Sequence, residues 1–200
     1  MRELRIKDEV PQLICVVVYK SHRRRVMKSS SIVFAGALFF AASGAFAQGA
    51  GPTDAQIAHI VVTANQVDID AGKLAQSKGH SKDVKAFGKQ MVTDHTGVNK
   101  QATALVKKLK VTPEDNPTSQ NLKSGGQENV KHLKTLKGAE FDKAYIDHEV
   151  TYHEQVLDAI DKTLVPNAKN EELKALIVKV RPAFVGHLEH AKQIQTTLGK

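Results

Sequence analysis

Four ionisable residues lie on otherwise apolar stripes of this sequence, one on each of four segments with helical periodicity. They are Asp68, His95, Glu149 and His187, and a fifth, His153, stands one helical turn after Glu149. A charge on an apolar face is costly to bury unless it is paired or binds a metal ion. Carboxylates and imidazoles together suit iron, manganese, zinc or copper(II). The pattern predicts a candidate metal site inside a helical protein.

A structural role is the alternative for the same residues. Asp–His and Glu–His pairs would form a buried hydrogen-bonded network that fixes helix register. A di-iron oxidase centre is disfavoured because it uses Glu-x-x-His on two helices. Here Val92 and Phe184 stand three residues before His95 and His187.

No catalytic residue is predicted, and the sequence favours a protein that is not an enzyme. It has no glycine-rich phosphate loop and no G-x-S-x-G motif. The single cysteine, Cys15, excludes an internal disulfide, an iron–sulfur cluster and a cysteine-ligated zinc site. The only cofactor that the residues suggest is a transition metal ion.

The elements that position these residues are predicted to be helices. Four apolar stripes of helical period predict long helices at roughly 53–78, 81–110, 139–164 and 170–198. Short links make each successive pair an antiparallel hairpin, and the segment 111–138 is long enough to run back along the bundle. A short fifth helix is expected there at 119–136, interrupted by Gly125-Gly126. Residues 53–198 are therefore predicted to be an all-α, ferritin-like four-helix bundle with a fifth helix in its single crossover.

This topology places the ionisable residues at similar depths. Counted from the 79–80 turn, Asp68, Glu149 and His187 lie ~16, ~15 and ~13 Å along the bundle, from the rise per residue of a helix. His95 and His153 lie about one turn deeper, near ~21 Å. Two carboxylates and one to three imidazoles are expected to converge.

Residues 1–47 are predicted to be a secretory signal peptide. Arg23, Arg24, Arg25 and Lys28 precede a short apolar run, and Ala45-Phe46-Ala47 has the pattern of a cleavage site. The run, residues 32–42, is shorter than the roughly 20 apolar residues of a membrane span. We expect cleavage between Ala47 and Gln48, a periplasmic or secreted mature chain, and no stable membrane insertion. An uncleaved signal anchor is the alternative.

The beginning of the chain leaves two further questions open. Met27-Lys28 would make a conventional start, so residues 1–26 are interpreted as a possible over-extension of the chain. If they are real, Arg23-Arg24-Arg25 loosely resembles a twin-arginine export signal. The same 47 residues hold eight Lys and Arg against three Asp and Glu, which is most of the net charge of +8. No nucleic-acid partner is therefore expected.

Several short motifs resemble a large bacterial family of exported proteins. They are Met91-Val92-Thr93-Asp94-His95, Gly138-Ala139-Glu140-Phe141-Asp142-Lys143-Ala144-Tyr145, His153, Pro182 and His187-Leu188. Together they resemble the family catalogued as domain of unknown function number four-one-four-two, whose members are often labelled outer membrane proteins. The resemblance spans about residues 53–198. It implies a ferritin-like bundle and export, and no established activity.

Two functional classes follow. The first is a non-enzymatic exported helical bundle that acts in envelope stress or through a partner. The second is a periplasmic metal-binding or redox protein that uses the five ionisable residues. The sequence identifies neither the metal, nor the partner, nor the oligomeric state.

Overall fold

The computed structural model describes residues 51–199, which form helices and no strand. In chain order these are α1 (Asp54–Lys78), α2 (Lys82–Leu109), α3 (Pro117–Thr135), α4 (Gly138–Ala159), a π-helical turn η1 (Ile160–Leu164), α5 (Val165–Asn167) and α6 (Glu171–Leu198). The predicted all-α class is confirmed. Among the described helices, none has the length and apolar character needed to cross a membrane. The predicted signal peptide, residues 1–47, and its cleavage site lie outside the described residues.

Polar caps explain where the long helices begin. Thr53 and Gln56 form the predicted capping box of α1, each side chain accepting from the backbone N–H of the other. The Ser81 hydroxyl accepts two backbone N–H groups at the start of α2. Asn170 does the same for α6, whose first turn carries two glutamates at its positive end.

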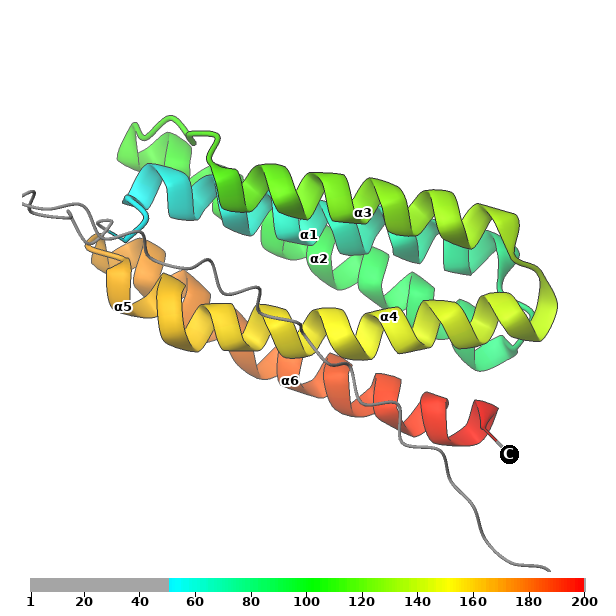
Figure 1. Ribbon diagram of the computed structural model, residues 1–200. Coiled ribbons are helices and arrows are strands. Elements are labelled where there is room, and N and C mark those ends of the chain that lie inside the picture. Colours follow the sequence, from blue (N-terminus) through cyan, green and yellow to red (C-terminus); the bar gives the residue numbers. More distant parts are fainter. Residues whose placement is uncertain (1–50, 200) are drawn as a thin grey trace, which may run out of the picture. The chain divides into compact units, whose positions relative to one another are not determined.

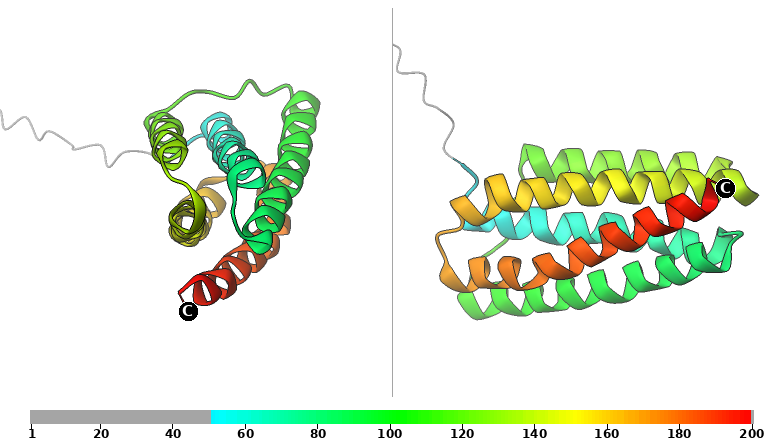
Figure 2. Two further views of the ribbon diagram at one scale, coloured as in Figure 1. Left: turned by 90° about the vertical axis from the view of Figure 1, so that its right-hand side faces the viewer. Right: turned by 90° about the horizontal axis from the view of Figure 1, so that it is seen from below.

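Helices α1, α2, α4 and α6 form a four-helix bundle, and α3 lies along the outside of α1 (Figures 1 and 2). Cross-helix hydrogen bonds from Tyr152 to Ala64 and from His187 to Asp94 join α4 to α1 and α6 to α2. Each bundle helix runs antiparallel to its neighbours, so α2 and α4 point the same way. Their connection must therefore return along the bundle, and α3 is this crossover, as predicted.

One predicted detail of the helices is wrong. Helix α3 continues through Gly125-Gly126 without interruption. The reason is packing: a Cβ on Gly126 would lie 2.7 Å from Cγ2 of Val67, so the missing side chain lets α3 lie close against α1. The predicted helix at 139–164 is α-helical to Ala159, passes through the π-helical turn η1 and continues as α5 to Asn167.

A glycine contact sets the register between α1 and α2. A Cβ on Gly72 would lie 2.8 Å from the carbonyl oxygen of Gly88, and a Cβ on Gly88 would lie 2.8 Å from that of Gly72. The two backbones can approach this closely only because both side chains are absent. Seven residues away along each helix stand Asn65 and His95, which are therefore placed opposite one another.

Polar contacts at two places hold the segment formed by α4 and η1 against α6. Arg181 forms two 2.7 Å hydrogen bonds with the carboxylate of Asp161. About four turns away along α4, the Gln195 amide donates to Asp147 at 2.7 Å. These contacts hold the register that brings His153 opposite His187.

The apolar core consists of two clusters along the bundle axis. The first includes Met91, Tyr145 and Ala191, and the second includes Val98, Leu157 and Phe184. Each of α2, α4 and α6 contributes to both clusters, and the ionisable residues predicted from the sequence lie between them.

Candidate metal centre

Five buried ionisable side chains meet between the two apolar clusters. They are Asp68 on α1, His95 on α2, Glu149 and His153 on α4, and His187 on α6, and each is at most 3% exposed. A ligand atom from each of the three histidines lies within 4.8 Å of the other two. One ligand atom from each of Asp68, Glu149 and His153 also lies within 4.8 Å of the other two. The structure therefore brings together all five residues that the sequence singled out, with His153 in both groups.

The orientation of His95 is fixed by Asn65. The Asn65 Nδ2 group donates to the carbonyl oxygen of Val61 at 2.8 Å, which leaves its Oδ1 as an acceptor. His95 Nδ1 lies 2.7 Å from this oxygen and must therefore carry the proton. His95 Nε2 is buried and has no hydrogen-bond partner. In this tautomer Nε2 holds a free lone pair.

The other two imidazoles are oriented in the same manner. His153 Nδ1 donates to the carbonyl oxygen of Glu149 at 3.0 Å, and His187 Nε2 donates to Asp94 Oδ2 at 2.9 Å. The remaining nitrogens, His153 Nε2 and His187 Nδ1, are buried without a partner. Each ring thus has one nitrogen held by the protein and one nitrogen left with a lone pair.

The two carboxyl groups interact with each other, and Glu149 also interacts with the Tyr145 hydroxyl, which lowers its pKa against the larger effect of burial. None of these contacts is a hydrogen bond of standard geometry. Asp68 Oδ1 and both carboxylate oxygens of Glu149 are buried with no hydrogen-bond partner. Asp68 Oδ2 lies 3.5 Å from His95 Nδ1, and Glu149 Oε2 lies 3.5 Å from His153 Nδ1. Both of these ring nitrogens already donate to closer oxygens, so neither pair forms the main contact of the carboxylate.

Burial controls the electrostatics of the centre. It raises the pKa of Glu149 to about 8. It also raises the pKa of Asp68, and the neighbouring charge of Glu149 raises it further. For the histidines burial acts the other way: it lowers the pKa of His153 to about 4 and lowers the pKa values of His95 and His187. At neutral pH the three imidazoles are uncharged, which is the state that binds a metal ion.

Aromatic side chains enclose this polar group. Phe184 stacks on the His95 ring with centroids 5.1 Å apart. Tyr145 and Tyr152 are buried beside the carboxylates: burial, followed by the charges of Glu149 and Asp68, raises the pKa of both phenols. The Tyr152 hydroxyl donates to the carbonyl oxygen of Ala64 at 3.1 Å.

Neighbouring polar residues have supporting roles. Asp94 lies at the margin of the apolar stripe of α2 and forms a contact between helices with His187 of α6. His190 Nδ1 lies 3.1 Å from Oε1 of Gln90 on α2, outside both ligand groups. Asn65 was not predicted. It stands three residues before Asp68 on the same helical face, so a search for neutral amides as well as charges would have found it.

The geometry supports binding of a cation. A metal ion would supply the positive charge that two adjacent carboxylates lack, and it would accept the free lone pairs of the imidazoles. Histidine ligands in metal sites donate their second N–H to a carboxylate, a carbonyl or water, and this interaction fixes the ring. His153 and His187 follow this rule, and Asn65 supplies an amide oxygen for His95.

A family model described as "Domain of unknown function (DUF4142)" matches residues 40–194, so the chain belongs to this family. The resemblance of its sequence motifs is thereby confirmed. No curated protein and no solved structure matches the chain.

Proposed function

We propose that this member of the DUF4142 family binds a transition metal ion through His95, His153, His187, Asp68 and Glu149. One observation carries the proposal: three oriented imidazoles, each with its second nitrogen free, lie within 4.8 Å of one another in a buried site. Nearly all buried polar atoms in proteins have a partner, so a cluster of atoms without one needs a reason. A bound cation supplies that reason.

A purely structural network accounts less well for these residues. Such a network would use the Asp–His and Glu–His pairs as its hydrogen bonds. The histidines instead donate to Asn65, to Asp94 and to a backbone carbonyl. No site histidine gives its main hydrogen bond to a site carboxylate, so the ionised carboxylates are costly in the interior.

The donor set defines the class of metal. Imidazole favours zinc, copper, iron and nickel, and carboxylates extend the set to manganese. The expected ion is therefore iron, manganese, zinc or copper(II). A metal-binding or redox role outside the cytoplasm fits the export signal expected in residues 1–47. No substrate-transforming step is assigned to the chain.

Metal analysis of untagged protein tests the proposal. Wild-type protein, freed of metal with a chelator, is dialysed against each of the four metals and then against buffer, and bound metal is measured by mass spectrometry. We expect stoichiometric binding of at least one metal and a metal-dependent rise in melting temperature, because a ligand of the folded state stabilises it.

Two variants and two controls complete the experiment. His187→Ala and His153→Ala should each abolish stoichiometric binding. His132→Ala, at an exposed position on α3, should leave binding unchanged, and His190→Ala should have a smaller effect than the site variants. Far-UV circular dichroism checks that each variant is folded. A wild-type protein that stays metal-free in all four dialyses would refute the proposal and leave the structural bundle as the remaining alternative.

A further inference from the structure

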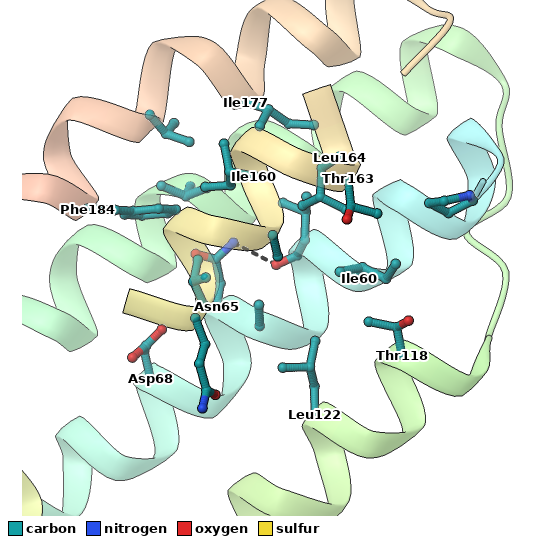
Figure 3. A pocket seen from close by; sticks show the side chains of 18 of the residues that line it. Ile60, Asn65, Asp68, Thr118, Leu122, Ile160, Thr163, Leu164, Ile177 and Phe184 are labelled. Atoms are coloured by element: carbon teal, nitrogen blue, oxygen red, sulfur yellow. Dashed lines mark hydrogen bonds between the residues drawn. The ribbon is translucent and has the colours of Figure 1, made fainter. Parts of the chain in front are cut away.

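A cavity of about 510 Å³ lies beside the candidate metal centre, within the size range of small-molecule sites. Most of its wall is apolar and comes from α1, α3, the α4–η1 segment and α6. Figure 3 shows Ile60, Leu122, Leu164 and Ile177 among the side chains around it. The cavity is therefore shaped for an apolar molecule.

Polar residues line the cavity at several places, among them Gln56, Asn116 and Gln155, and one polar part of the wall belongs to the metal centre. Asn65, Asp68 and His95 line the cavity. Asp68 Oδ1 and His95 Nε2 are both without a hydrogen-bond partner, in side chains that are more than nine-tenths buried. These two atoms are covered, so a molecule in the cavity contacts the residues that hold them rather than the atoms themselves.

The charge of the wall selects against ions. No lysine or arginine is found among the lining residues within 51–199, so an anionic head group would meet no cation there. A cationic head group would compete with the metal ion that we propose for the same carboxylates. A neutral molecule with one hydrogen-bonding group fits both the apolar wall and the polar end.

The π-helical turn contributes to the shape of the cavity. Ile160, Thr163 and Leu164 of η1 line it, next to Ala159 at the end of α4. A π turn shifts the following side chains around the helix axis, and such turns are frequent at functional sites. Thr163 and Ala159 are only half-buried, so larger side chains at these positions can extend into the cavity.

We infer that this cavity binds a neutral, mainly aliphatic or aromatic small molecule, whose polar group contacts the Asn65, Asp68 and His95 end. Binding of the apolar part does not depend on a metal ion. Contact between the ligand and a bound metal rests on the function proposed above.

The test uses metal-free protein and the neutral fluorescent probe N-phenyl-1-naphthylamine. Wild type should bind one equivalent of probe. Ala159→Phe should fill the cavity and weaken probe binding at least tenfold, while Ala139→Phe, an exposed alanine at the start of α4, should not change it. If Ala159→Phe does not fold by circular dichroism, Thr163→Phe takes its place.

Competition identifies the ligand class. Decanol should displace the probe at lower concentration than decanoate. Absence of probe binding, equal binding by the cavity variant, or stronger displacement by decanoate would overturn the inference. Because the protein is metal-free, these outcomes are independent of metal analysis: probe binding by a chain that takes up no metal supports the cavity while refuting the metal centre.

Discussion

At the residue scale, the hydrogen bonds of the three imidazoles decide what the centre can do. His95 and His153 donate through Nδ1, whereas His187 donates through Nε2. The free nitrogen is accordingly Nε2 in the first two rings and Nδ1 in the third. Asn65 and Asp94 are positioning residues, since they hold a ring without offering the atom that would bind a metal.

The role of Asn65 can be tested with a near-isosteric apolar variant. Asn65→Leu removes the acceptor of His95 Nδ1–H, so the ring loses its fixed orientation and tautomer. We expect metal affinity to fall about 10–100-fold, as is typical for such supporting residues. Asn99→Leu on α2 is the matched control, because the Asn99 amide donates to the carbonyl oxygen of Val62 and not to a site histidine. Equal metal affinities in the two variants would contradict the positioning role.

The pH dependence of stability provides a second test at this scale. It is measured on metal-free protein with a chelator present. The folded state holds the Glu149 proton up to about pH 8, whereas the unfolded chain releases it near the ordinary value of 4.5. The Glu149 carboxyl therefore makes its full contribution to the free energy of unfolding below pH 4.5. This contribution decreases above pH 4.5 and is lost as the pH rises through 8. The free energy of unfolding should fall by roughly 1–2 kcal/mol between pH 6.5 and 8.

The histidines act in the opposite pH window. Their folded pKa values lie below the ordinary 6.5, so acidification below pH 6.5 protonates the unfolded chain first and destabilises the fold. Urea unfolding across pH 5–8.5 measures both the acid and the alkaline decline in the free energy of unfolding. Glu149→Gln should remove the alkaline decline, and Glu154→Gln, on the exposed face of α4, should retain it. A decline that survives in Glu149→Gln would show that another group causes it.

At the element scale, glycines fix how closely the helices approach. Gly72 and Gly88 bring α1 and α2 together, and Gly126 brings α3 against Val67. At Gly97, Gly125 and Gly186, by contrast, a Cβ would meet no neighbouring atom within 4 Å. Glycines in similar helical settings therefore have opposite roles, and only their surroundings distinguish them.

The α1–α2 contact predicts opposite effects for two substitutions on one helix. Gly88→Ala would place a methyl group 2.8 Å from Ala75 Cβ and from the carbonyl oxygen of Gly72, so the helices must separate. It should destabilise the protein by roughly 1–3 kcal/mol and weaken metal binding through Asn65 and His95. Gly97→Ala meets no atom and should stabilise by up to about 1 kcal/mol. Chemical denaturation of both variants gives the comparison.

The crossover helix offers a parallel test. Gly126→Ala should loosen α3 from α1, because the new methyl group would lie 2.7 Å from Val67 Cγ2. Gly125→Ala, one position earlier, should strengthen α3 through helix propensity alone. Amide hydrogen exchange of residues 117–135 should accelerate in the first variant and slow in the second. Equal exchange in both would argue against the close contact.

The sequence predicted the helices and the centre because both are encoded in periodicity. Asp68, His95, Glu149 and His187 stood out by breaking apolar stripes, and caps such as Thr53 and Ser81 marked the helix starts. Tautomers, the glycine contact and the η1 turn could not be predicted. They depend on which atoms meet across helices, and a single helical stripe carries no such information.

At the scale of the whole molecule, the centre joins the two halves of the bundle. The α1–α2 hairpin supplies Asp68 and His95, and the α4–α6 hairpin supplies Glu149, His153 and His187. A bound ion would connect the halves across the interior. The two apolar clusters also span both hairpins, so the core and the site form only when both are assembled.

Export remains a prediction for the chain as a whole. Protein expressed with residues 1–47 in a Gram-negative host should be recovered from the periplasm, and its intact mass should correspond to a chain that begins at Gln48. The physical basis is the positive segment, the short apolar run and the small residues at 45 and 47. An Ala47→Leu variant is the control, because a bulky residue at the cleavage position should leave precursor uncut. Full-length wild-type chain in the membrane fraction would contradict the prediction.

The pairing of two carboxylates with three uncharged imidazoles has a consequence for electroneutrality. When both carboxylates are ionised, a divalent ion brings the formal charge of the centre to zero, and a trivalent ion leaves one positive charge in the protein interior. An uncompensated charge is disfavoured in such surroundings. A bound iron or manganese ion would therefore be biased towards its reduced state, and its oxidation would require a proton to leave or an anion to enter. Electron transfer at this centre would thus be linked to the release of a proton or the entry of an anion.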